Sequence, residues 1–131
     1  MKPDEEPWHA HVYAREDERA ASEVVRTWFT EALASGRIAG LRYVGPLAKG
    51  AVGPHPLPQF EVHFLSSAEP EVRAVIDSSG LTALIHPLTH DDLADHTTLA
   101  QWIGEALPLD LSVLDPPSVN QGLPRFGRTD L

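Results

Sequence analysis

The chain has 131 residues with ten basic and nineteen acidic side chains, which give a formal net charge of −9 at pH 7. This length suffices for one domain with its own core, and the acidic balance argues against nucleic acid or an anionic membrane surface as partner. Because the sequence contains no cysteine, any metal must be held by histidine or carboxylate side chains. The same absence suits the reducing cytosol, and no signal core or membrane-spanning apolar run is present, so we expect a cytoplasmic protein.

The first predicted element is a strand over residues 8–13, "WHAHVY", in which His9, His11 and Tyr13 alternate with three apolar side chains. A helix is predicted from about 17 to 35, because apolar residues recur there at helical spacing. The members of this apolar stripe are Ala21, Val24, Val25, Trp28, Phe29, Ala32 and Leu33.

Two strands are predicted in the middle of the chain. Residues 40–47 form the weaker one, whereas residues 59–65 alternate cleanly, with Glu61 and His63 opposite three apolar side chains. The loop between these strands is dense in glycine and proline and carries His55 near its centre.

The last part of the chain predicts a short helix over 68–79, a strand over 81–87 that carries His86, and a further helix over about 90–105. Capping-box spacing at the start of this last segment favours the helix. The proline-rich remainder, 108–131, should be an extended tail.

The predicted order is β-α-β-β-α-β, the ferredoxin-like α+β pattern, with an extra C-terminal helix and a tail. We expect a single domain over 1–131, with its core at about 8–107 and the tail at 108–131. Two right-handed crossovers then place the strands in the spatial order fourth, first, third, second.

This order brings the polar residues of three neighbouring strands to the sheet face away from the helices, which we expect to be open. Side chains two residues apart on a strand are about 6–7 Å apart at the backbone, so two imidazoles there can lean toward one cation. With no thiolates, imidazole plus carboxylate suits iron, manganese, nickel, copper or zinc. The residues expected to converge are His9, His11, His63, His86 and Glu61, with His55 from the loop.

Each of these residues also has a plainer interpretation. A histidine or glutamate on a sheet face is commonly a tolerated polar residue, and that reading stays open for Glu61. His96 lies on an otherwise apolar helical face, which favours a core histidine bonded to backbone. His90 lies in the cap region and is expected to face solvent. For Tyr13 the plainer interpretation is packing at the edge of the sheet.

Four segments together resemble the DOPA 4,5-dioxygenase family: "WHAHVY", "GPHPLPQFEVHF", "LIHPLTHDDLADHTTLAQWIG" and "LPLDLSVL". The resemblance covers roughly residues 8–114 and implies a ferredoxin-like fold and extradiol cleavage of a catechol by dioxygen at non-haem iron(II). In the namesake activity the catechol is 3,4-dihydroxyphenylalanine. His90 stands where the family commonly has glycine, which leaves the substrate of this chain open. Matching the motifs places five residues on the family's histidines: His9, His11, His55, His86 and His96.

The resemblance and the sheet-face pattern together give each residue a role. The predicted ligands of the metal are His9, His11 and His86, with Glu61 as a fourth or alternative ligand. The metal is expected to be iron(II), with zinc or another divalent ion able to replace it in purified protein. The remaining assignments are His55 and His63 as acid/base residues, His96 as an orienting residue and Tyr13 as lining of the ring pocket.

The expected partners are a small aromatic substrate, dioxygen and a second copy of the chain, because Tyr13 and Leu84 would otherwise be exposed on an open sheet face. The competing hypothesis is a non-catalytic dimeric module whose histidines hold a structural metal or a small ligand. A metal site with an open coordination position that accepts iron would favour the enzyme.

Overall fold

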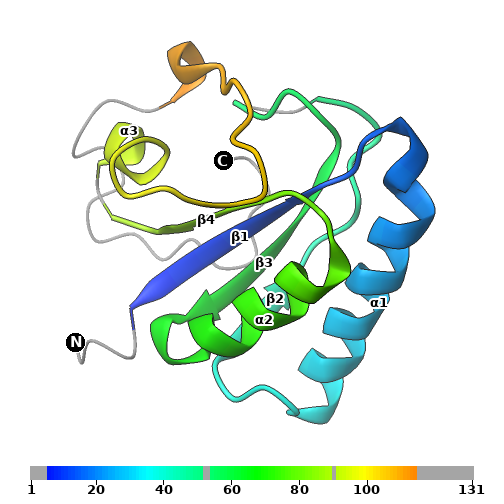
Figure 1. Cartoon of the computed structure of the whole chain (residues 1–131). Helices are drawn as coiled ribbons and strands as arrows, with labels where there is room; N and C mark the ends of the chain where they lie inside the picture. Colours follow the sequence, from blue (N-terminus) through cyan, green and yellow to red (C-terminus); the bar gives the residue numbers. More distant parts are fainter. Residues whose placement is uncertain (1–5, 52–53, 90, 115–131) are drawn as a thin grey trace.

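A computed structural model describes residues 6–51, 54–89 and 91–114. Its strands and helices, in chain order, are β1 (Pro7–Tyr13), α1 (Arg19–Ser35), β2 (Leu41–Val44), β3 (Gln59–Leu65), α2 (Glu69–Ser79), β4 (Ala83–Pro87), α3 (Asp92–Asp95) and β5 (Gln101–Ile103). Single 3-10 turns stand at Glu16–Glu18, Ser66–Ala68 and Leu111–Val113. Figure 1 shows α1 and α2 lying on one face of the sheet, with α3 at the opposite end from α1.

The five strands form one sheet in the order β2-β3-β1-β4-β5, and every neighbouring pair is antiparallel. The predicted order fourth, first, third, second is therefore confirmed, and so is the ferredoxin-like α+β class. β1 lies between β3 and β4, so its side chains have neighbours on both sides.

The core lies between the sheet and the two long helices. The alternation predicted from sequence is confirmed, since the apolar residues of β1 and β3 pack against Phe29 of α1 and Ile76 of α2. Two members of the predicted α1 stripe are outside this core: Ala21 is exposed, and Val24 is 70 % exposed. The helix presents a narrower face than the predicted stripe, and Ser22 takes a buried position on it.

The helix predicted over about 90–105 is wrong. Only the turn Asp92–Asp95 is helical, and it begins where the Asp91 carboxylate accepts a hydrogen bond from the Ala94 N–H at 3.0 Å. Beyond it, Gln101–Ile103 forms β5 on the free edge of β4. An unpaired strand edge offers backbone hydrogen bonds, and Trp102 and Ile103 suit a strand, so pairing prevails over the helical spacing.

The expectation of an open histidine face is also wrong, because the chain covers this face itself. Trp102 of β5 stacks on Tyr13 with ring centroids 6.0 Å apart, and the loop bearing His55 is tied to the Asp110 segment by a backbone bond from Asp110 to Pro54. Tyr13 and Leu84 are fully buried in one chain. The residues that motivated a dimer therefore need no partner to cover them.

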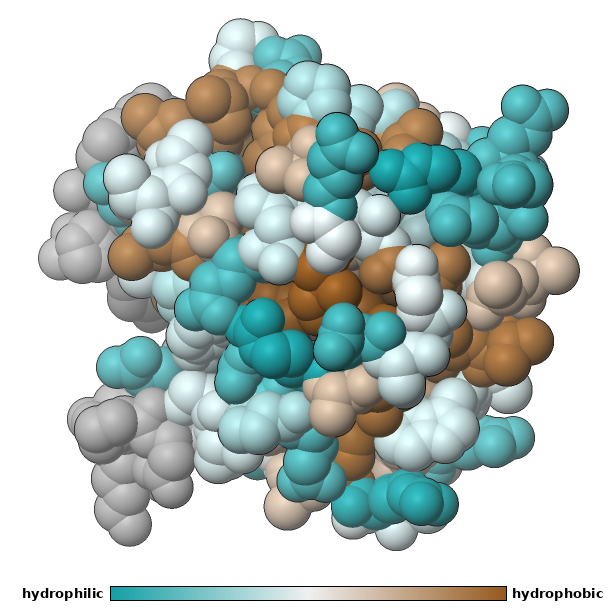
Figure 2. All heavy atoms as spheres, in the orientation of Figure 1, coloured by the Kyte–Doolittle hydropathy of each residue, from teal (hydrophilic) through white to brown (hydrophobic). Residues whose placement is uncertain are grey.

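Apolar side chains still reach the surface in places, as Figure 2 shows by brown areas among hydrophilic ones. Among the described residues, no helix is long and apolar enough to cross a membrane. Of the predicted tail, residues 108–114 contain the turn Leu111–Val113, and residues 115–131 lie outside the described part. In the described part of the chain, the exposed large apolar residues are Val24, Leu93, Leu99, Leu111 and Val113.

Candidate metal centre

The strand register places imidazoles side by side on the face away from α1 and α2. His9 pairs with His63 across β1 and β3 and with His86 across β1 and β4, while His11 pairs with Glu61. All five side chains are buried, at 0 or 1 % exposure. The alternation of β1, β3 and β4 thus builds a buried row of titratable groups that crosses three strands.

His11 and His86 form a close pair in this row, with their Nε2 atoms 2.9 Å apart. The Nδ1 atom of His86 lies 2.7 Å from the Pro87 carbonyl, and the Nδ1 atom of His11 lies 3.1 Å from Oε1 of Gln59. A carbonyl oxygen only accepts hydrogen bonds, so each Nδ1 carries the hydrogen and each Nε2 presents a lone pair. Burial first, and then the neighbouring histidines, hold the pKa of His11 well below its ordinary value, which keeps that lone pair free.

Two bare lone pairs at this separation repel each other unless a cation lies beside them. Histidine nitrogens bind zinc at about 2.0–2.1 Å, so the nitrogen atoms of two adjacent ligands of one ion are roughly 3 Å apart. The donor atoms of His9, His11 and His86 all lie within 4.8 Å of one another. The chemistry and spacing of this trio fit a divalent metal such as iron(II) or zinc.

Glu61 does not join that trio but groups with His9 and His63. Its Oε1 accepts a hydrogen bond from Nε2 of His63 at 2.8 Å and lies 3.9 Å from Nδ1 of His9. The His63 ring stacks on His9 with centroids 3.5 Å apart. The other carboxylate oxygen, Oε2, is buried with no hydrogen-bond partner among the described residues.

His55 and His96 come from outside the strands that carry the row. His55 lies with its ring centroid 4.2 Å from His11, and His96, just after α3, lies 4.5 Å from His86. Nδ1 of His55 is 2.7 Å from the Tyr13 hydroxyl. Burial first and His96 second lower the pKa of His55 to about 3, while burial raises the pKa of Tyr13. The structure therefore brings together all eight residues singled out from sequence.

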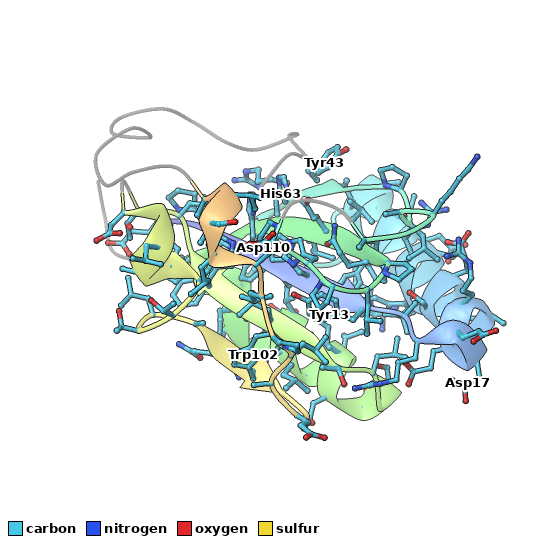
Figure 3. All side chains as sticks on the ribbon, turned by 90° about the horizontal axis from the view of Figure 1, so that it is seen from above. Tyr13, Asp17, Tyr43, His63, Trp102 and Asp110 are labelled. Atoms are coloured by element: carbon cyan, nitrogen blue, oxygen red, sulfur yellow. The ribbon has the colours of Figure 1, made fainter. Side chains whose placement is uncertain are left out.

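Three neighbours of the cluster were missed. Gln59 lies two positions before Glu61 on the same strand and therefore points to the same face, so the alternating pattern could have identified it. Tyr43 of β2 reaches His63 at a centroid distance of 4.8 Å, and the assignment of a helix hid Trp102. Figure 3 labels Tyr43 near His63 and Tyr13 near Trp102.

The sheet and the cluster define a ferredoxin-like α+β protein with a buried, histidine-rich site. A sequence model of the Dopa 4,5-dioxygenase family matches residues 8–113, and the chain belongs to that family. This membership confirms the resemblance carried by the four sequence segments.

Individual relatives agree with the family. The chain is 30 % identical over 112 residues to a DOPA 4,5-dioxygenase of Amanita muscaria, covering 82 % of the chain and 49 % of that protein. An uncharacterised 21.2 kDa protein of Botryotinia fuckeliana is 40 % identical over 75 residues, covering 48 % of the chain and 40 % of that protein. The chain thus spans about half the length of these relatives, or less.

A solved structure supports the same fold. The crystal structure of a dioxygenase candidate from Nostoc punctiforme superimposes with a TM-score of 0.70 at 28 % identity, covering 84 % of the chain and 91 % of that protein.

Proposed function

We propose that the protein is an extradiol-type aromatic ring-opening dioxygenase that acts on a catechol such as 3,4-dihydroxyphenylalanine. The observation that carries this proposal is the His11–His86 pair, whose Nε2 atoms face each other at 2.9 Å while both Nδ1 atoms contact carbonyl oxygens. The family and the name of the Amanita muscaria relative support the reaction. His9, His11 and His86 would hold the metal, proposed to be iron(II).

When bound, iron(II) would supply a redox-active centre at which a catechol and dioxygen can be brought together. The residues around it have separate tasks. Glu61 orients His63 through the 2.8 Å hydrogen bond, which suits His63 to proton transfer, and its free oxygen makes Glu61 the alternative carboxylate ligand. His55 lies beside His11 with ring centroids 4.2 Å apart and is within reach of the same site. His96 packs against His86 and limits its rotation.

The test is anaerobic reconstitution with iron(II), followed by a screen of catechols for dioxygen uptake. We expect a yellow ring-opened product from 3,4-dihydroxyphenylalanine or a related catechol. The zinc-loaded protein should be inactive, because zinc has no redox chemistry with which to activate dioxygen. If no catechol consumes dioxygen in the iron-loaded protein, the proposed reaction is wrong.

Gln59 offers a test of the metal site that needs no turnover. Gln59→Met keeps a side chain of similar size but removes the oxygen that accepts the hydrogen bond from Nδ1 of His11. We expect the dissociation constant for zinc to rise roughly 10- to 100-fold. Gln59→Glu keeps an acceptor and should bind zinc at least as well as the wild type. Calorimetric titration measures both values, with the exposed Gln101→Met as the matched control. Equal affinity in Gln59→Met would show that His11 is not a ligand through Nε2.

One observation favours the alternative, a non-catalytic module with a structural metal. His9, His11, His63 and His86 have no exposed surface, whereas a catalytic metal needs an open position. X-ray absorption of the zinc-loaded protein distinguishes the two: a full set of protein ligands favours the module, and a water among the ligands favours the enzyme.

A homodimer also stays a proposal, with a different surface from the one expected. Its support is now the segment 93–113, which carries four of the five exposed large apolar side chains found among the described residues. Light scattering that gives only the monomer mass at micromolar concentration would contradict it. A cytoplasmic location likewise remains a prediction from the cysteine-free sequence.

A further inference from the structure

We propose that Tyr13 is a positioning residue that fixes His55 with its hydrogen on Nε2. His55 would then serve as a hydrogen-bond donor to a negatively charged oxygen of the substrate, and not as a base. The tautomer depends only on the contacts of this chain, whereas the donor role rests on the proposed function and narrows it.

The first step is the direction of the bond between Tyr13 and His55. A phenol has a single hydrogen, and a buried hydroxyl that donates to nothing is costly. Among the described residues, the hydrogen-bond partner of the Tyr13 hydroxyl is Nδ1 of His55, at 2.7 Å. Tyr13 therefore donates, and Nδ1 of His55 accepts with its lone pair. An imidazole with a bare Nδ1 is neutral and carries its one hydrogen on Nε2.

The second step is the place of that Nε2 hydrogen. Nε2 of His55 is buried and has no hydrogen-bond partner among the described residues, while the ring lies 4.2 Å from that of His11. A buried N–H without an acceptor costs about 1–3 kcal/mol, which an oxygen atom placed there would offset. A fixed N–H of this kind stabilises developing negative charge on oxygen. In this tautomer His55 is not a metal ligand, because one nitrogen carries hydrogen and the other accepts from Tyr13, although its ring groups with those of His11 and His96.

The third step is the rigidity of Tyr13. Its ring is fully buried and stacks on Trp102 at an interplanar angle of 16°, so the hydroxyl has little freedom to turn away from His55. Tyr13 thus holds His55 and does not line a ring pocket.

Nitrogen NMR of the metal-free protein tests the tautomer directly, since protonated and bare ring nitrogens resonate in different ranges. We expect His55 to show a bare Nδ1 and a protonated Nε2. Tyr13→Phe should lower the population of this tautomer, because Nδ1 loses its donor, and Tyr43→Phe, the matched control, should leave it unchanged. A protonated Nδ1 in the wild type, or an unchanged pattern in Tyr13→Phe, would overturn the proposal. Circular dichroism confirms that each variant is folded.

Turnover then tests the donor role. His55→Gln keeps an N–H near the position of Nε2 but has no basic nitrogen, so kcat should stay within about tenfold of the wild type. His55→Leu removes the donor and should lower kcat roughly 10²- to 10³-fold. Equal losses in both variants would make His55 a base and end the donor role. If the tautomer is as expected but no catechol is turned over, Tyr13 keeps its positioning role and only the proposed reaction fails.

Discussion

His11→Ala should lose most of the metal that the wild-type protein carries when purified without chelator or histidine tag. Nε2 of His11 lies 2.9 Å from Nε2 of His86. His11 also belongs to two groups of described residues that could hold a metal, one with His9 and His86 and the other with His55 and His96. Loss of a residue that hydrogen-bonds a metal ligand already lowers the metal affinity about 10- to 100-fold. Loss of the ligand itself should therefore lower it by more than about 100-fold. Elemental analysis of the purified variant measures the change.

Two further variants make this result interpretable. His11 is fully buried, so alanine leaves a cavity, and His11→Gln tests whether a folded protein of nearly unchanged volume also loses the metal. His90→Ala is the control for losing one histidine that the sequence places outside the cluster. Near-stoichiometric metal in both folded His11 variants would refute the ligand assignment.

The histidine row could be predicted because a strand has a fixed side-chain period of two. That period places His9 and His11 on the face opposite the core, and the crossover rule then puts β1 between β3 and β4. These two rules put His9, His63 and His86 on one face of three neighbouring strands, and the strand register shows that His9 lies between His63 and His86. Local pattern and chain topology were sufficient for this part of the site.

The burial of this histidine row by β5 and Trp102 could not be predicted in the same way. Whether Gln101–Ile103 becomes helix or strand depends on the free edge of β4, which exists only once the sheet has formed. The stacking of Trp102 on Tyr13 follows from that pairing. An open face was therefore expected where the structure has a buried one. The burial alters the chemistry, because removal from water lowers the pKa of an imidazole and so favours its neutral form.

The metal-free protein should become markedly less stable as the pH falls from 7 toward 4. Burial and then His96 lower the pKa of His55 in the folded protein to about 3, against about 6.5 in an unfolded chain. Between these two values the unfolded chain binds a proton that the folded protein does not, so stability is complete above about pH 6.5 and falls below it. At pH 4.5 the loss from His55 alone is about 2.7 kcal/mol, two pH units at 1.36 kcal/mol each. His11 contributes a further loss of stability at low pH, since its pKa is also lowered.

Urea denaturation at a series of pH values measures this loss as a free energy of unfolding. His55→Gln has no group to protonate at this position, so its stability should depend less on pH by about the same 2.7 kcal/mol between pH 7 and 4.5. The comparison uses the slope of the unfolding free energy against pH, so a packing defect that lowers the stability of the variant equally at every pH does not affect it. Parallel curves for the wild type and His55→Gln would contradict the prediction, because they would mean that folding does not lower the pKa of His55.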